Sequence, residues 1–157
     1  MFHSNLEAWI VNEYDIRGIH TIDDLSIENL CLQFNIDLEF TDSESKCIWD
    51  DGYQLILLKQ DQPLENQRWD FFHELGHIMR HVGNQRAMPL LMIEYVEAQA
   101  RQFSMYASMP FPIIKPYLTS SYNSQEIAEL FTLPVSIVED RLAMILRQLN
   151  SGRGKPS

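Results

Sequence analysis

Cysteine is scarce in this 157-residue chain, which contains only Cys31 and Cys47. The two residues do not form the Cys-x-x-Cys spacing of a metal knuckle or a redox motif. A small secreted protein that depends on disulfides would carry several pairs. We therefore predict two reduced thiols, and we expect neither a zinc knuckle nor a disulfide framework.

Long apolar runs are also missing from the sequence. No run approaches the roughly 18 residues that a membrane-spanning helix requires. The first residues, Met1 to Glu7, lack the basic start and the apolar stretch of a signal peptide. These absences predict a cytoplasmic protein without a membrane partner. The length is sufficient for one hydrophobic core with a small added lobe.

Positively charged residues are also scarce. The chain has 12 Lys and Arg but 22 Asp and Glu, so its net charge is −10. Binding to the phosphates of nucleic acid depends on clustered Lys and Arg. We therefore expect no direct nucleic-acid partner. An acidic surface can attract a basic protein, although it can also serve solubility alone.

The segment His73–His77, with the sequence HELGH, carries recognisable chemistry. Residues four apart lie on the same side of an α-helix, so the two imidazoles can bind one Zn²⁺ at about 2.0–2.1 Å. Glu74 between them can act on a water at that metal. Apolar residues recur at helical spacing after Pro63, which predicts one helix around the motif. Gly76 either lets another backbone approach the metal or is a tolerated helix glycine.

The third zinc ligand has to come from elsewhere in the chain. His81 lies about 6 Å of helical rise beyond His77, so we predict that it is not a ligand. A second helical stretch, residues 90–108, carries Glu94 and Glu97 one turn apart. Either glutamate can complete a His₂Glu site.

Several segments together resemble the ImmA/IrrE family of zinc metallopeptidases. Residues 73–77 are followed by Glu97-x-x-Ala100-Arg101-x-Phe103-Ser104 and then by Met109-Pro110, and Arg68 to Phe72 precede the motif. The resemblance covers roughly residues 25–145. It implies a gluzincin-like enzyme with His73, His77 and Glu97 as zinc ligands and Glu74 as the catalytic base. Arg101 departs from the pattern, since the family commonly has Asn or Asp there.

The resemblance also implies a biological role. Members look like anti-repressors of phages or mobile elements, which cleave a helix-turn-helix transcriptional repressor and so release its genes. The protein substrate is then expected to be such a repressor. The Arg101 departure supports an alternative, a metal-site binding module that sequesters a regulator or toxin partner without cutting it. The sequence predicts no oligomeric state.

The predicted fold class is α+β. Alternating residues at 36–40, and runs at 46–49 and 53–58 around Asp50-Asp51-Gly52, predict a small three-stranded sheet that packs with the motif helix and other helices. We expect a zincin-like metallopeptidase domain at 1–118, a helix-turn-helix-like lobe at 119–150 and a flexible tail at 151–157. The lobe's two helices, at 124–131 and 136–150, carry more apolar area than they can bury between themselves. We expect them to dock on the peptidase domain or on a partner.

Overall fold

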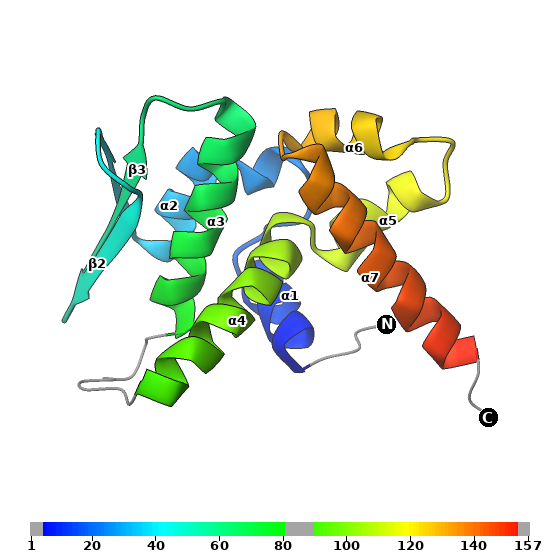
Figure 1. The fold of residues 1–157 in the computed structure, drawn as a ribbon, viewed down its shortest axis with the longest axis horizontal. Helices are drawn as coiled ribbons and strands as arrows, with labels where there is room; N and C mark the ends of the chain where they lie inside the picture. The colour runs from blue at the N-terminus through cyan, green and yellow to red at the C-terminus, as the bar shows by residue number, and fades with distance from the viewer. Residues whose placement is uncertain (1–4, 81–89, 154–157) are drawn as a thin grey trace.

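The computed structural model describes the backbone of residues 5–80 and 90–153 and the side chains of residues 6–79 and 99–152. The fold is α+β, as predicted (Figure 1). Its elements, in chain order, are α1 (Asn5–Ile16), the 3-10 helix η1 (Asp23–Leu25), α2 (Ile27–Phe34), β1 (Asp37–Thr41), β2 (Lys46–Asp50), β3 (Tyr53–Lys59), α3 (Leu64–Arg80), α4 (Leu90–Ser108), α5 (Phe111–Leu118), α6 (Ser124–Phe131) and α7 (Val135–Arg153).

The three strands form one mixed sheet in the order β1-β3-β2. β2 and β3 make the predicted antiparallel hairpin, in which Asp50 faces Tyr53 across the turn. Gly52 in that turn has a φ of 75°, a backbone conformation that is unfavourable for residues with a Cβ atom. β1 pairs with β3 in parallel, with Leu38 opposite Ile56. β2 is therefore an edge strand of the sheet.

Helix α3 lies between the sheet and α4 (Figure 1). It contacts β2 and β3 on one side and α4 on the other. One face of the sheet supplies Leu38, Cys47, Ile56 and Leu58 to the hydrophobic core. This arrangement brings the helix that carries the His73–His77 motif to the middle of the molecule.

Helix α5 lies in the proline-rich segment, where the sequence predicted only an interruption after residue 108. The interruption itself is present, because Pro110 has an extended backbone and ends the path of α4. Pro112 then sits in the first turn of α5, where a missing backbone N–H costs nothing. The same residue type therefore ends one helix and begins the next.

The two C-terminal helices pack on the rest of the chain, as expected from their apolar content. α6 begins with a capping box, in which the Asn123 side chain accepts from the Glu126 N–H at 2.8 Å and Glu126 accepts from the Asn123 N–H at 3.1 Å. The buried apolar residues of both helices belong to the same core cluster as Phe71 and Phe72 of α3.

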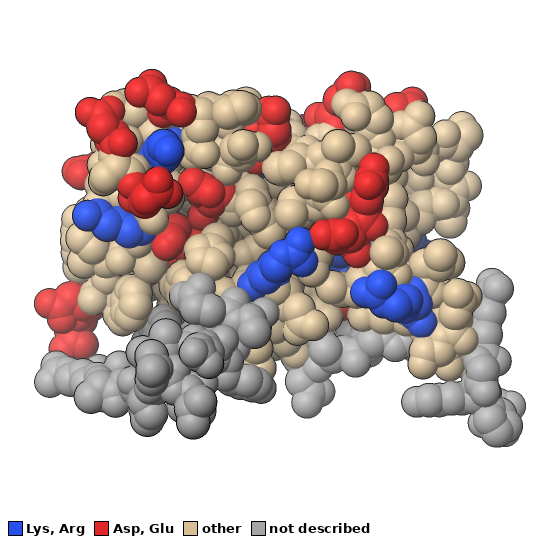
Figure 2. Space-filling model, viewed as in Figure 1, with Lys and Arg blue, Asp and Glu red and all other residues tan. Residues whose placement is uncertain are grey.

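The elements just described include no helix that is both long and apolar enough to cross a membrane. Acidic side chains outnumber basic ones on the face shown in Figure 2, both over the sheet side and over the α6 side. Neither Cys31 nor Cys47 forms a disulfide.

Candidate metal centre

Helix α3 begins immediately after Pro63, whose carbonyl oxygen accepts from the N–H groups of Asn66 and Gln67. Its apolar stripe is fully inside the core, since Phe71, Phe72 and Leu75 have no exposed surface. This burial fixes the rotation of the helix about its own axis. The side chains beside the stripe therefore have a defined direction.

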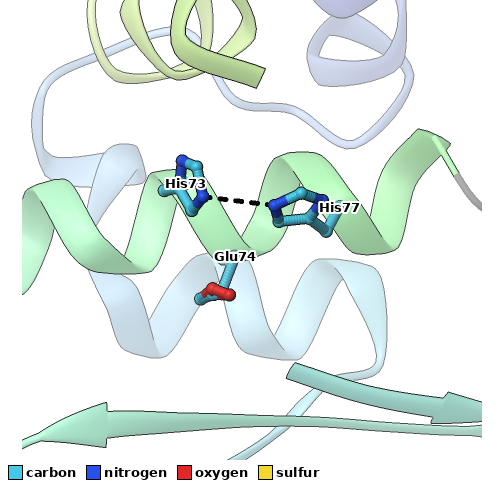
Figure 3. Close-up of side chains that lie close together, drawn as sticks. All are labelled: His73, Glu74 and His77. Carbon is cyan, nitrogen blue, oxygen red and sulfur yellow. Dashed lines mark hydrogen bonds between the residues drawn. The ribbon is translucent and has the colours of Figure 1, made fainter. Parts of the chain in front are cut away.

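The imidazoles of His73 and His77 lie side by side along α3 (Figure 3). Their Nε2 atoms are 3.1 Å apart, and the ring planes meet at 80°. Both side chains are partly exposed, in contrast to the buried stripe next to them. The spacing of four residues thus produces the paired nitrogen atoms that the sequence predicted.

Glu74 leaves α3 toward the sheet, whereas both imidazoles lie on another side of the helix (Figure 3). Its side chain is only 7% exposed. One oxygen of Glu74 and one nitrogen of each histidine all lie within 4.8 Å of one another. In the part of the chain that the structure describes, these residues form the one group of three possible metal-binding side chains.

The histidine pair fits a tetrahedral metal ion. Two Zn–N bonds of standard length at a tetrahedral angle place the nitrogen atoms about 3.3 Å apart. The observed 3.1 Å between the Nε2 atoms is close to that value. Two neutral imidazole nitrogens this close need either a shared proton or a cation, because both otherwise present lone pairs.

The side chains of three residues considered as ligands lie outside the described residues. His81 lies outside the described residues, directly after the end of α3. Glu94 and Glu97 belong to helix α4, as predicted. The structure describes their backbone but not their side chains. The choice of Glu97 as the third ligand therefore stays a prediction.

Gly76, between the two histidines, faces the ring of Phe103 on α4. A Cβ at position 76 would lie 2.7 Å from Cδ1 of Phe103, which is shorter than any normal contact. The residue that approaches Gly76 is thus an aromatic side chain, and the glycine serves the close packing of α3 on α4. Ala100 and Phe103 are both buried on this side of α4.

Arg101 of α4 forms an ion pair with Asp140 of α7, with 2.7 Å between Nη2 and Oδ2. Both side chains are about half exposed. The residue that departs from the family pattern therefore joins α4 to the C-terminal helix. Ser104, three residues later, is buried and donates its hydroxyl to the Ala100 carbonyl at 2.8 Å.

Two arginines, Arg68 partly buried and Arg141 fully buried, hold the helices around the centre, and sequence reasoning gave neither of them this role. Arg68 donates from Nε to the Phe131 carbonyl and from Nη2 to the Leu25 carbonyl, both at 3.2 Å. Arg141 has no exposed surface, and its Nε donates to the Met109 carbonyl at 3.0 Å. Burial lowers the pKa of both guanidinium groups. In the sequence, Arg141 lies within an apolar helical stripe, and this position was the available indication that its side chain is buried.

The class of protein follows from comparison with known families. The IrrE N-terminal-like domain (Peptidase_M78) matches residues 31–143, which is more than half of the chain. The chain belongs to this metallopeptidase family, and its His73-Glu74-His77 group is HExxH-like. The predicted resemblance and the enzyme class are thereby confirmed.

Two relatives from Bacillus subtilis (strain 168) are similar over most of their length. The chain is 28% identical to the uncharacterized protein YqaB over 94% of its own residues and 87% of that protein. It is 30% identical to the phage-like element PBSX protein XkdA over 92% of its own residues and 75% of that protein. No solved structure matches the chain.

Proposed function

We propose that the chain is a zinc-dependent endopeptidase in which His73, His77 and Glu97 hold the metal. The observation that carries this proposal is the pair of Nε2 atoms at 3.1 Å beside the buried Glu74 carboxylate. Family membership adds support for peptide hydrolysis. The zinc assignment follows from the donor set, because two imidazoles and a carboxylate form the His₂Glu set of catalytic zinc sites.

A bound Zn²⁺ supplies a Lewis acid for the scissile carbonyl and lowers the pKa of a coordinated water toward about 7. Glu74 is the general base and takes the proton of the attacking water. It then delivers this proton to the leaving amine. One oxygen of Glu74 lies within 4.8 Å of a nitrogen of each histidine, which supports this role. The low exposure of Glu74 limits competing contact with bulk water.

The edge strand β2 is the proposed binding element for the substrate. Its outer edge has no strand partner among the described residues, and α3 lies beside it. A peptide in extended form can pair with such an edge through main-chain hydrogen bonds. Ile48 and Trp49 on β2 are exposed and offer apolar contacts to the side chains of that peptide.

The proposed substrate is a helix-turn-helix transcriptional repressor, which makes the protein an anti-repressor. A DNA-binding repressor carries a basic surface, and the net charge of −10 on this chain favours its approach. The similarity to a protein of a phage-like element supports a role in a mobile element. A repressor acts in the cytoplasm, so we place the enzyme there as well.

Co-expression with the repressor encoded beside its gene tests the proposal. We expect discrete repressor fragments with the wild-type chain and intact repressor with the Glu74→Gln variant. Intact repressor that forms a stable complex with both chains would contradict proteolysis. That result would favour the alternative of a non-cleaving module that sequesters its partner.

A further inference from the structure

A cluster of polar side chains joins the start of β2 to α3. The Ser45 hydroxyl donates to Oδ2 of Asp70 at 2.7 Å, and its oxygen accepts from the Lys59 N–H at 2.9 Å. Ser45 directly precedes β2, Lys59 is the last residue of β3, and Asp70 lies on α3. One hydroxyl group thus connects both strands of the hairpin to the motif helix.

Gln62 completes the cluster from the connection between β3 and α3. Its Nε2 donates to Oδ2 of Asp70 at 3.0 Å and to the Lys59 carbonyl at 2.9 Å. Both backbone groups of Lys59 are therefore bonded by side chains that also bind Asp70. All of these groups are part-buried, so the hydrogen bonds have limited competition from water.

Asp70 lies one helical turn before the candidate centre on α3. It precedes His73 by three residues and Glu74 by four, which are the spacings of neighbours on one helix face. β2 and α3 run in roughly the same direction (Figure 1). The turn of helix that separates Asp70 from Glu74 spans about 6 Å, a length that β2 covers in about two residues.

We propose that Asp70 and Ser45 are positioning residues that fix the register of β2 along α3. This inference rests on the proposed peptidase function, because β2 is the proposed binding edge. A peptide paired with β2 takes its position along α3 from that strand. The Asp70–Ser45 contact therefore decides which peptide bond lies at the histidine pair.

The test compares Asp70→Ala with Asp70→Asn in the full zinc-loaded chain. Asn keeps one side-chain oxygen that accepts from Ser45 and Gln62, whereas Ala removes every acceptor. Exchange of the backbone amides of residues 46–50, measured by mass spectrometry, is expected to be about tenfold faster in Asp70→Ala, because the hydrogen bonds from Ser45 and Gln62 to Asp70 are lost. Asp70→Asn and the charge control Glu65→Ala are expected to match the wild type.

Kinetics provide the second measurement. The probe is a quenched-fluorescent peptide that spans the cleavage site mapped in the co-expressed repressor. We expect Asp70→Ala and Ser45→Ala to raise KM roughly tenfold with little change in kcat, and to add cleavage at neighbouring bonds. The double variant is expected to lose less than the sum of the two single losses, because the two residues share one contact. Ser45→Thr, which keeps the hydroxyl, is expected to restore the wild-type KM.

Two results would overturn the positioning role. One is unchanged amide exchange on β2 in Asp70→Ala, and the other is a loss in Asp70→Asn as large as that in Asp70→Ala. Failure of the proposed function gives a different result, because the wild-type chain would then cleave neither repressor nor peptide. The exchange measurement would still show whether Asp70 holds β2 in place.

Discussion

Gly76 of α3 and Phe103 of α4 are in such close contact that a side chain at position 76 would clash with the ring unless the ring moved. A Cβ there would lie 2.7 Å from Cδ1 and 3.2 Å from Cγ of the buried ring. The glycine sits between His73 and His77 in the sequence, so this contact with α4 lies beside the histidine pair. The helix that carries Glu97 is held against the motif helix by this contact.

Gly76→Ala is therefore expected to destabilise the protein although alanine favours helices. Alanine gains about 1 kcal/mol of helix propensity, whereas overpacking of a buried ring costs about 1–3 kcal/mol. Urea unfolding is expected to show a net loss of about 1 kcal/mol. The double variant Gly76→Ala/Phe103→Leu provides space for the new methyl group and is expected to recover part of the loss. Equal stability of Gly76→Ala and wild type would show that the ring can move away.

The metal prediction is one equivalent of Zn²⁺ per chain after purification without added metal. His77→Ala removes one of the two nitrogen atoms now 3.1 Å apart, and we expect it to lose the metal. Glu97→Ala is expected to lose it too, while Glu94→Ala keeps it. Elemental analysis measures all three variants. Full metal content in Glu97→Ala together with loss in Glu94→Ala would transfer the ligand role to Glu94.

Glu74→Gln keeps the shape of the side chain and removes its ability to accept a proton. We expect bound metal to stay at the wild-type level and repressor cleavage to fall by about 10²–10⁴-fold. Elemental analysis and a quantified cleavage assay on the same preparations separate these two effects. Loss of metal together with activity would assign Glu74 a role in metal binding, and unchanged cleavage would exclude it as the base.

Arg141 and Glu7 form a buried ion pair between α7 and α1, with 3.8 Å between Nη1 and Oε2. Both side chains are at most 1% exposed. Arg141→Met is expected to destabilise the protein by about 3–5 kcal/mol, because the Glu7 carboxylate loses its charged partner in the interior. Replacing both residues, as in Glu7→Leu/Arg141→Met, is expected to recover most of that loss. Denaturant unfolding of the three proteins measures it, and equal losses in the single and double variants would argue against the pair.

Burial, together with the nearby Glu28 and Asp37 carboxylates, raises the pKa of the Cys31 thiol to about 11. An unfolded thiol titrates near pH 8.5, so the native state binds more protons between about pH 8.5 and 11. The contribution of Cys31 to stability is complete below that range and is lost as pH rises through it. The free energy of unfolding should fall more steeply over this range in the wild type than in Cys31→Ala. Parallel curves would show that Cys31 does not titrate in this way.

Local sequence patterns predicted most of the secondary structure. The Asp-Gly turn and the runs on either side of it predicted the hairpin, and the apolar stripe predicted α3, because both patterns depend on neighbours within a few residues. The prediction missed α5, because proline is a residue type that both ends helices, as Pro110 does, and occurs in their first turn, as Pro112 does. The second C-terminal helix was predicted to begin at Ser136 but begins at Val135, so Ser136 lies inside its first turn.

The sequence by itself determined the histidine pair, because four residues of α-helix bring two imidazoles together whatever surrounds them. Only the tertiary structure decided that Gly76 accommodates Phe103 and that Arg101 pairs with Asp140. The same holds for the contact of Ser45 with Asp70. The partners in the Ser45 and Arg101 pairs are 25 and 39 residues apart, and no local pattern relates them. Burial of the apolar faces of α3, α4 and the sheet sets those distances, because the core fixes how the elements lie against one another.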